Sequence, residues 1–120
     1  MRDDDAYIVG ILAQLLGEFE VLILLAVLRL TDDAAYPPAV RTEIERRAGR
    51  SVQRGAVYVT LDRLESKRLL TSRVDAAGAE PGRPRRFYRV SPKGLRALRR
   101  ALRAVEQMRA GLEPLLGDNC

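Results

Sequence analysis

The spacing of the apolar residues changes from helical to alternating at Leu70, and this change constrains the fold more than any other feature. Up to Lys67, apolar residues recur every three or four positions, as on one face of a helix. From Leu70 they alternate with polar residues, as in a half-buried strand. A stretch rich in Gly and Pro, 75–86, then leads to the aromatic and β-branched segment 87–90. The pattern predicts several helices followed by a β-hairpin with a long tip.

Three helical segments are expected before residue 50. Residues 1–17 form an amphipathic helix or arm behind an acidic cluster. The next helix, 18–30, is apolar nearly all round, so it should be buried in the protein or in its dimer. Pro37 and Pro38 suit the first turn of another helix, which Gly49 ends.

A further helix is expected from about Arg54 to Lys67, and its two sides differ. One side carries Val57, Leu61, Leu64 and Arg68, of which the first three are apolar, and this side is expected to be buried. The opposite side is small or polar and carries Gly55, Val59, Asp62 and Ser66, flanked by Tyr58 and Arg63. This is the pattern of a helix that packs with one side and enters a groove with the other.

The last helix begins after Ser91, an N-cap residue, and Pro92, which suits a first turn. Apolar residues follow at three- or four-residue spacing, namely Leu95, Leu98, Leu102, Val105 and Leu112. Gly111 and Pro114 should end or kink this helix. The order of elements predicts a mainly α fold with a small β-hairpin, a winged helix-turn-helix over 18–91 with a C-terminal dimerisation helix and tail over 92–120.

Basic charge is concentrated in the later part of the chain. Residues 1–35 carry 2 basic and 7 acidic side chains, whereas residues 36–120 carry 19 and 9. A surface that binds a polyanion needs such segregation, because neutralising phosphates releases counterions. Biased composition, with Arg in place of Lys, would explain the number of arginines but not their uneven distribution.

The inventory of reactive residues argues against an enzyme. The chain has no His, its single cysteine is Cys120, and no glycine-rich loop matches a nucleotide-binding pattern. No cofactor, metal site or disulfide is expected. The single cysteine has no partner for a disulfide within the chain, so we expect the protein to act in a reducing compartment. The apolar run 21–28 is far shorter than the roughly 20 residues that span a bilayer, so no membrane segment is expected. These features together predict a cytoplasmic protein.

The expected DNA contacts lie on two elements. The helix from Arg54 should contribute Gln53, Arg54, Gly55, Tyr58 and Arg63, and the hairpin tip should contribute Arg83, Arg85 and Arg86. Guanidinium groups suit phosphates and the narrow minor groove. For Tyr58 the alternative is that the ring packs and only its hydroxyl reaches out. Asp62 has no assigned role, because a carboxylate near phosphate is repelled.

Three stretches resemble the PadR family of transcriptional repressors, especially its short members. They are Leu16–Glu20, Gly55–Glu65 and Gly82–Gly94, which follow one another in that family's order. The resemblance implies a winged-helix repressor that dimerises through its terminal helices and binds a two-fold DNA operator. It also implies release by a small phenolic or drug-like effector, whose existence and identity the residues do not indicate.

The chain departs from the family pattern at three positions. Tyr36-Pro37 stands where Tyr-Gly is usual, which a first turn tolerates. Gln53 replaces a capping Ser and Arg68 replaces a Gly after the recognition helix. These two changes should each cost about 1 kcal/mol, through a weaker cap and a left-handed non-glycine residue.

An obligate homodimer is expected, because two helices present more apolar surface than a short monomer can cover. The residues expected at the interface are Phe19, Leu22, Ile23, Leu95, Leu98, Leu102 and Val105. The other functional class that the charge pattern allows is a winged-helix protein-interaction module, whose basic hairpin would meet an acidic partner. Steep salt dependence and strong preference for one DNA sequence would separate the two classes.

Overall fold

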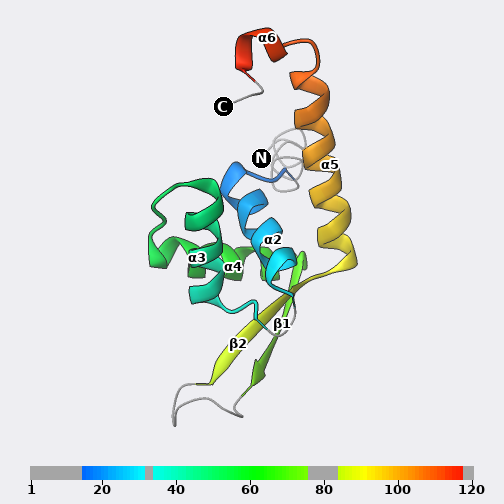
Figure 1. Cartoon of the computed structure of the whole chain (residues 1–120). Helices are drawn as coiled ribbons and strands as arrows, with labels where there is room; N and C mark the ends of the chain where they lie inside the picture. The colour runs from blue at the N-terminus through cyan, green and yellow to red at the C-terminus, as the bar shows by residue number, and fades with distance from the viewer. Residues whose placement is uncertain (1–14, 32–33, 76–83, 118–120) are drawn as a thin grey trace, which may run out of the picture.

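The computed structural model describes residues 15–31, 34–75 and 84–117. In these residues three helices precede an antiparallel hairpin and two helices follow it (Figure 1). The elements are α2 (Glu18–Leu30), α3 (Pro37–Ala48), α4 (Arg54–Ser66), β1 (Leu70–Asp75), β2 (Arg85–Val90), α5 (Pro92–Arg109) and α6 (Glu113–Leu116). The winged helix-turn-helix architecture is therefore confirmed. The helix expected within 1–17 and the hairpin tip carrying Arg83 lie outside the described residues.

Helix α2 lies at the centre of the fold and contacts α3, α4, α5 and β2. Its buried apolar side chains meet those of α3, α4 and β1 in one core, whose largest fully buried members are Ile23, Leu24, Val40, Val57, Leu61, Leu64 and Leu70. The hairpin extends from one end of this bundle, and α5 runs beside α2 in the opposite direction (Figure 1). The nearly all-apolar sequence of α2 is thus explained by burial on several sides.

A buried carboxylate joins the start of α2 to the end of α4. Glu20 accepts a hydrogen bond from the Gly17 amide (3.0 Å) and another from Lys67 Nζ (2.9 Å). Burial alone raises the pKa of Glu20, but the Gly17 amide and the Lys67 ammonium outweigh it, so the pKa lies below its ordinary value. The sequence identifies Glu20 only as a first-turn carboxylate, because Lys67 is 47 residues away.

Both departures at the ends of α4 have the expected backbone consequences. Gln53 is the N-cap and makes no side-chain capping bond, and Arg68 adopts a left-handed conformation with φ of 65°. Helix α4 ends at Ser66, one residue before the predicted end. Arg68 is exposed, so the prediction that it continues the buried side of α4 is wrong. The left-handed backbone turns its side chain away from that side.

The hairpin is longer than the sequence predicts. Strand β2 begins at Arg85 instead of residue 87, and its register pairs Asp75 with Arg85 and Leu70 with Val90. Arg85 and Arg86 are therefore strand residues, not part of an open loop. On the other edge of β2, the Tyr88 amide donates to the carbonyl of Ala35 (2.9 Å), which fastens the hairpin to the segment before α3.

Ser91 caps α5 as expected, and it also fixes the chain after α4. Its hydroxyl accepts from the Gly94 amide (2.9 Å) and donates to the carbonyl of Arg68 (2.7 Å). Gly94 packs so closely that a Cβ there would lie 2.1 Å from the Leu69 carbonyl oxygen. Helix α5 ends at Arg109, so Leu112 lies outside it and does not extend its apolar seam.

Two residues expected at a dimer interface instead belong to the protomer core. Ile23 is fully buried and Leu98 is 2% exposed within a single chain. Both lie on the sides of α2 and α5 that face each other and the rest of the core, so neither side chain is available to a second copy. None of the helices in the described residues is long and apolar enough to cross a bilayer.

Candidate nucleic-acid interface

The turn between α3 and α4 is held by two side chains of α3. Arg41 donates from Nε to the carbonyl of Val52 (2.7 Å), and a carboxylate oxygen of Glu45 accepts from the Val52 amide (3.0 Å). Gly49 ends α3 in a left-handed conformation with φ of 67° and so starts this turn. Because both backbone polar groups of Val52 bond to α3, the start of α4 has a fixed position relative to α3.

The residues of α4 and its N-cap that were expected to contact DNA are all exposed, namely Gln53, Arg54, Gly55, Tyr58 and Arg63. The side opposite them is buried through Val57, Leu61 and Leu64. Tyr58 is 40% exposed, and the Arg54 guanidinium lies 5.8 Å from the centroid of its ring. This ring therefore supports a cation at the surface in addition to any packing.

Gly55 is surrounded by open space. A Cβ built at this position meets no heavy atom within 4 Å, and its φ is not in the left-handed region. Neither packing within the protomer nor backbone conformation requires a glycine there. By contrast, Gly94 is required by its contact with Leu69.

A groove of about 280 Å³ lies between the first turns of α3 and α4. Its walls combine two arginines, two hydroxyl-bearing side chains and one carboxylate with two prolines and a valine, namely Pro37, Pro38, Arg41, Thr42, Glu45, Arg54, Val57 and Tyr58. Arg54 and Tyr58 were expected at the interface, whereas Thr42, which lines the same groove, was not. Spacing within α3 does not reveal which of its polar residues faces α4.

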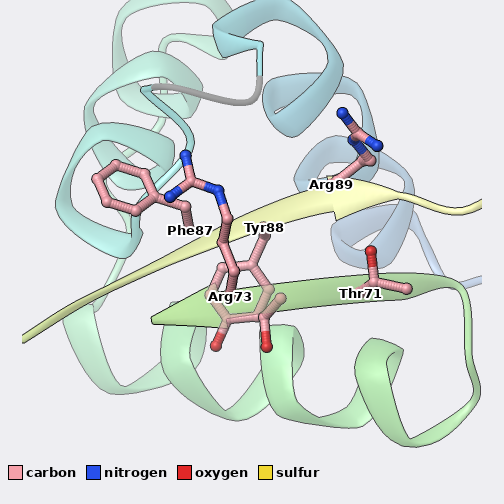
Figure 2. A pocket seen from close by; sticks show the side chains of 6 residues that line it. Thr71, Arg73, Phe87, Tyr88 and Arg89 are labelled. Carbon is pink, nitrogen blue, oxygen red and sulfur yellow. The ribbon is translucent and has the colours of Figure 1, made fainter. Parts of the chain in front are cut away.

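The pleat of the hairpin sends Arg85 and Arg86 to opposite faces. One face, here called the α4-side face, carries Ser72, Val74, Arg86 and Tyr88; the other, the Tyr36-side face, carries Thr71, Arg73, Arg85, Phe87 and Arg89. Figure 2 shows the Tyr88 ring directed toward α4, whereas Phe87 and Arg89 point to the other side. The two arginines therefore meet different surroundings.

Arg86 belongs to a chain of hydrogen bonds on the α4-side face. Its guanidinium donates to the Ser72 hydroxyl (2.8 Å), which donates to a carboxylate oxygen of Glu65 in α4 (2.5 Å). Burial raises the pKa of Tyr88, and the nearby carboxylates of Asp62 and Glu65 raise it further. Asp62, which had no assigned role, thus lies close to the hairpin as well as at the exposed side of α4.

Arginines and aromatic rings alternate on the Tyr36-side face. The Arg85 guanidinium lies 5.1 Å from the Tyr36 ring centroid, and that of Arg73 lies 4.9 Å from the Phe87 ring. The two rings are 5.8 Å apart. A pocket of about 200 Å³ opens here beside Thr71, Arg73, Phe87 and Arg89 (Figure 2). Arg73 and Arg89 were not among the expected DNA-contact residues, because only the strand register reveals that they share a face with Arg85.

The family model for the transcriptional regulator PadR-like family matches residues 24–100, which include α3, α4, the hairpin and most of α2. The chain belongs to the PadR-like family. Its members are DNA-binding transcriptional regulators, so the exposed side of α4 and the hairpin described above lie in a DNA-binding fold. No curated protein sequence matches this chain significantly.

Solved structures of PadR-like proteins share the fold. A PadR family regulator from Eggerthella lenta is 28% identical, with a TM-score of 0.63, and the match covers 97% of this chain and 96% of that one. A PadR-like transcription factor from Bacteroides fragilis is 24% identical (TM-score 0.64; 81% and 88% covered), and a PadR-like regulator from Bacillus cereus is 21% identical (TM-score 0.62; 81% and 92% covered). The similarity to the Bacteroides fragilis and Bacillus cereus proteins is evidence for the fold alone.

The apolar seam of this PadR-like protein is exposed at its outer end. Leu102 is 42% exposed and Val105 is 58% exposed, and the seam continues into Met108, which is also exposed. The other residues expected at the dimer interface, Phe19, Leu22 and Leu95, are half-buried. Within the described residues no group of three or more His, Cys, Asp or Glu side chains could hold a metal ion.

Proposed function

We propose that this PadR-like protein is a sequence-specific transcriptional repressor that binds a two-fold DNA operator as a homodimer. The observation that carries the proposal is the exposed start of α4, where Arg54 and Tyr58 flank a glycine with open space above it. A glycine at such a place lets another backbone approach closely. The N-terminus of α4 would meet a DNA phosphate and set how deeply Gln53, Arg54 and Tyr58 enter the major groove.

The hairpin would supply a second contact along the same duplex. Arg85 and Arg83 would bind phosphates or enter the minor groove, and Arg86 would reach DNA beside α4 while it remains bonded to Ser72. Arg63, exposed near the end of α4, would bind the phosphate backbone. These contacts orient the protein on DNA, whereas the side chains at the start of α4 read the bases.

Dimerisation would use the exposed outer part of the α5 seam, Leu102 and Val105, together with the half-buried Phe19, Leu22 and Leu95. A two-fold dimer places its two α4 helices in successive major grooves, so the half-sites should be centred about one helical turn apart. A small effector bound between the subunits would change this spacing and release the operator. In this function the chain has no catalytic role and acts on chromosomal DNA in a bacterial cytoplasm.

Selection of duplexes from a random library tests the proposal. We expect one two-fold sequence to be enriched, and its affinity should exceed that of random duplex by at least about 10³-fold at physiological salt. Equal binding to all duplexes, or none, would contradict it. In either case the hairpin would bind an acidic protein partner, and that protein should displace any DNA that binds without sequence preference.

A further inference from the structure

The outer side of α5 carries a row of arginines that the interface above does not use. Arg96, Arg99, Arg100 and Arg103 follow one another at helical spacing and are all exposed. In the described part of the chain, none of the four has a hydrogen-bond or ion-pair partner. Glu106 is the only acidic residue of α5. We call these four arginines the α5 basic face.

Three residues of the α5 basic face, Arg96, Arg100 and Arg103, lie opposite the apolar seam of the same helix, and Arg99 lies at the edge of that seam beside Leu95. Gly94 and Leu98 are the buried residues of α5, and Leu102 and Val105 continue their side. At 100° per residue, Arg96 and Arg103 lie about half a turn away from that side. A dimer formed through the seam would therefore leave the α5 basic face exposed.

We propose that the α5 basic face is a second, sequence-independent binding site for duplex DNA, so that one dimer holds two DNA segments. The inference rests on the proposed function only in taking the first duplex to occupy α4 and the hairpin. From Arg96 to Arg103 the helix rises about 10 Å, and one strand of duplex DNA carries a phosphate every ~3.4 Å along the axis, so about three phosphates of that strand lie within this rise. The charges of this face are thus closely matched by a phosphate backbone.

A duplex that contacts α4 and the hairpin would not extend to this face. Helix α5 starts where β2 ends, at the base of the hairpin, and runs away from the hairpin (Figure 1). Arg100 and Arg103 therefore lie progressively farther from a duplex that contacts the hairpin. A contact that uses all four arginines needs a separate segment of DNA.

The composition of the face favours nucleic acid over other polyanions. A helix that binds a membrane surface inserts an apolar side beneath its basic residues, but here Leu98 on the apolar side is buried in the core, and the exposed Leu102 and Val105 would be covered in the proposed dimer. The residues that dominate binding at protein interfaces include Trp and Tyr beside Arg, and α5 has no aromatic side chain. Charge alone is sufficient for sequence-independent DNA binding.

Capture of a second duplex tests the proposal with the full chain. Selected operator duplex is fixed to beads and saturated with protein, and a fluorescent random-sequence duplex is then added. Wild-type protein should retain the random duplex, and R99Q/R103Q should retain about tenfold less, with the salt slope of capture lower by ~0.9 per lost phosphate contact. R99K/R103K keeps the charge and should behave like wild type.

The matched control is R29Q/R46Q, which removes the same charge from exposed arginines of α2 and α3. It should leave capture unchanged, and operator footprints should be the same for every variant. Unchanged capture by R99Q/R103Q would overturn the proposal, as would an operator affinity that falls in parallel with capture. Binding of wild type to anionic lipid vesicles or polyglutamate, without capture of DNA, would also overturn it.

Failure of the proposed function has a different signature. If no operator is enriched, a random duplex replaces it on the beads. If R99Q/R103Q then captured less of the fluorescent duplex than wild type and R29Q/R46Q did, the α5 basic face would be supported as a DNA-binding site even though the repressor proposal had failed.

Discussion

Two glycines show how the same residue type serves different ends in this protein. Gly94 packs against a carbonyl within the protomer, whereas Gly55 faces open space at the start of α4. The sequence identifies both as glycines of helices but does not distinguish them. The contrast gives two predictions that separate folding from binding.

Gly94→Ala should destabilise the protein by about 3 kcal/mol, because a buried methyl group would overlap the Leu69 carbonyl and force the backbone apart. Thermal or urea unfolding monitored by circular dichroism measures this loss. Gly55→Ala is the matched control and should be neutral or slightly stabilising, since alanine has the higher helix propensity. A fully stable Gly94→Ala would contradict the observed contact.

Gly55→Leu should fold and dimerise normally yet bind its operator poorly, because the side chain fills the space that DNA must occupy. Footprinting of the folded variant is the decisive measurement. Full protection of the operator would mean that a different side of α4 faces DNA. Arg54→Ala should cost about 1–3 kcal/mol and relax the preference at one base pair per half-site if Arg54 reads guanine.

At the scale of elements, the hairpin is linked to α4 through one of its faces only. The Arg86–Ser72–Glu65 chain lies on the α4-side face, while Arg85 lies over Tyr36 on the other. The two adjacent arginines should therefore respond differently to the same substitution.

Arg85→Ala should weaken operator and random DNA by similar factors, lower the salt slope by about 0.9 per protomer and lower the unfolding free energy by only about 0.5 kcal/mol, because its contact with the Tyr36 ring is exposed. Arg86→Ala should also lower the unfolding free energy by about 1 kcal/mol, because it removes a hydrogen bond that orders the hairpin beside α4. Salt titrations and urea unfolding measure the two effects. Identical behaviour of the two variants would contradict the assignment to different faces.

The Glu20–Lys67 contact between α2 and α4 should make stability depend on pH. The pKa of Glu20 in the folded protein lies below its ordinary value of 4.5, so its stabilising contribution is present above that value. The contribution is lost as the pH falls through the lowered, folded-state pKa. Comparing unfolding of wild type and Glu20→Gln from pH 7 to pH 3 should show the difference in stability shrinking in acid; a constant difference would contradict it.

At the scale of the whole molecule, the apolar seam of α5 is divided between folding and assembly. Leu98 is buried in the protomer, whereas Leu102 and Val105 are exposed. Leu98→Glu therefore tests folding and would not isolate dimerisation.

Leu102→Glu combined with Val105→Glu should give a folded monomer that no longer binds the operator, because each half-site alone is too weak. Sedimentation at micromolar concentration and circular dichroism check the assembly and the fold, and footprinting checks binding. The matched control is Leu115→Glu, which changes an exposed leucine of α6 outside the seam. Operator binding by a monomeric variant would break the link between assembly and function.

The sequence by itself determined the order of the elements from α2 to α5 and the exposed side of α4, whereas the short helix α6 stands where a tail was expected. Helical and alternating spacing, prolines at first turns and the Ser91 cap are local signals, and a local signal is strong when propensity and burial agree. Even the left-handed Arg68 and the uncapped Gln53 follow from single positions. The exposed residues of α4 that we propose to contact DNA could be predicted for the same reason, because the spacing over one turn of a helix reveals its exposed side.

Only the tertiary structure decided which apolar and charged residues serve the protomer and which face outward. Leu98 and Leu102 are equivalent in a seam, but only Leu98 is covered by α2 and its neighbours. Arg85 and Arg86 are adjacent in sequence, but the register of β2 against β1 sends them to opposite faces. Glu20 and Lys67 meet across 47 residues. The spacing of residues along the chain shows which of them share a side of a helix or strand. Which side is buried, and which residues pair, depends on the other elements that pack against that helix or strand.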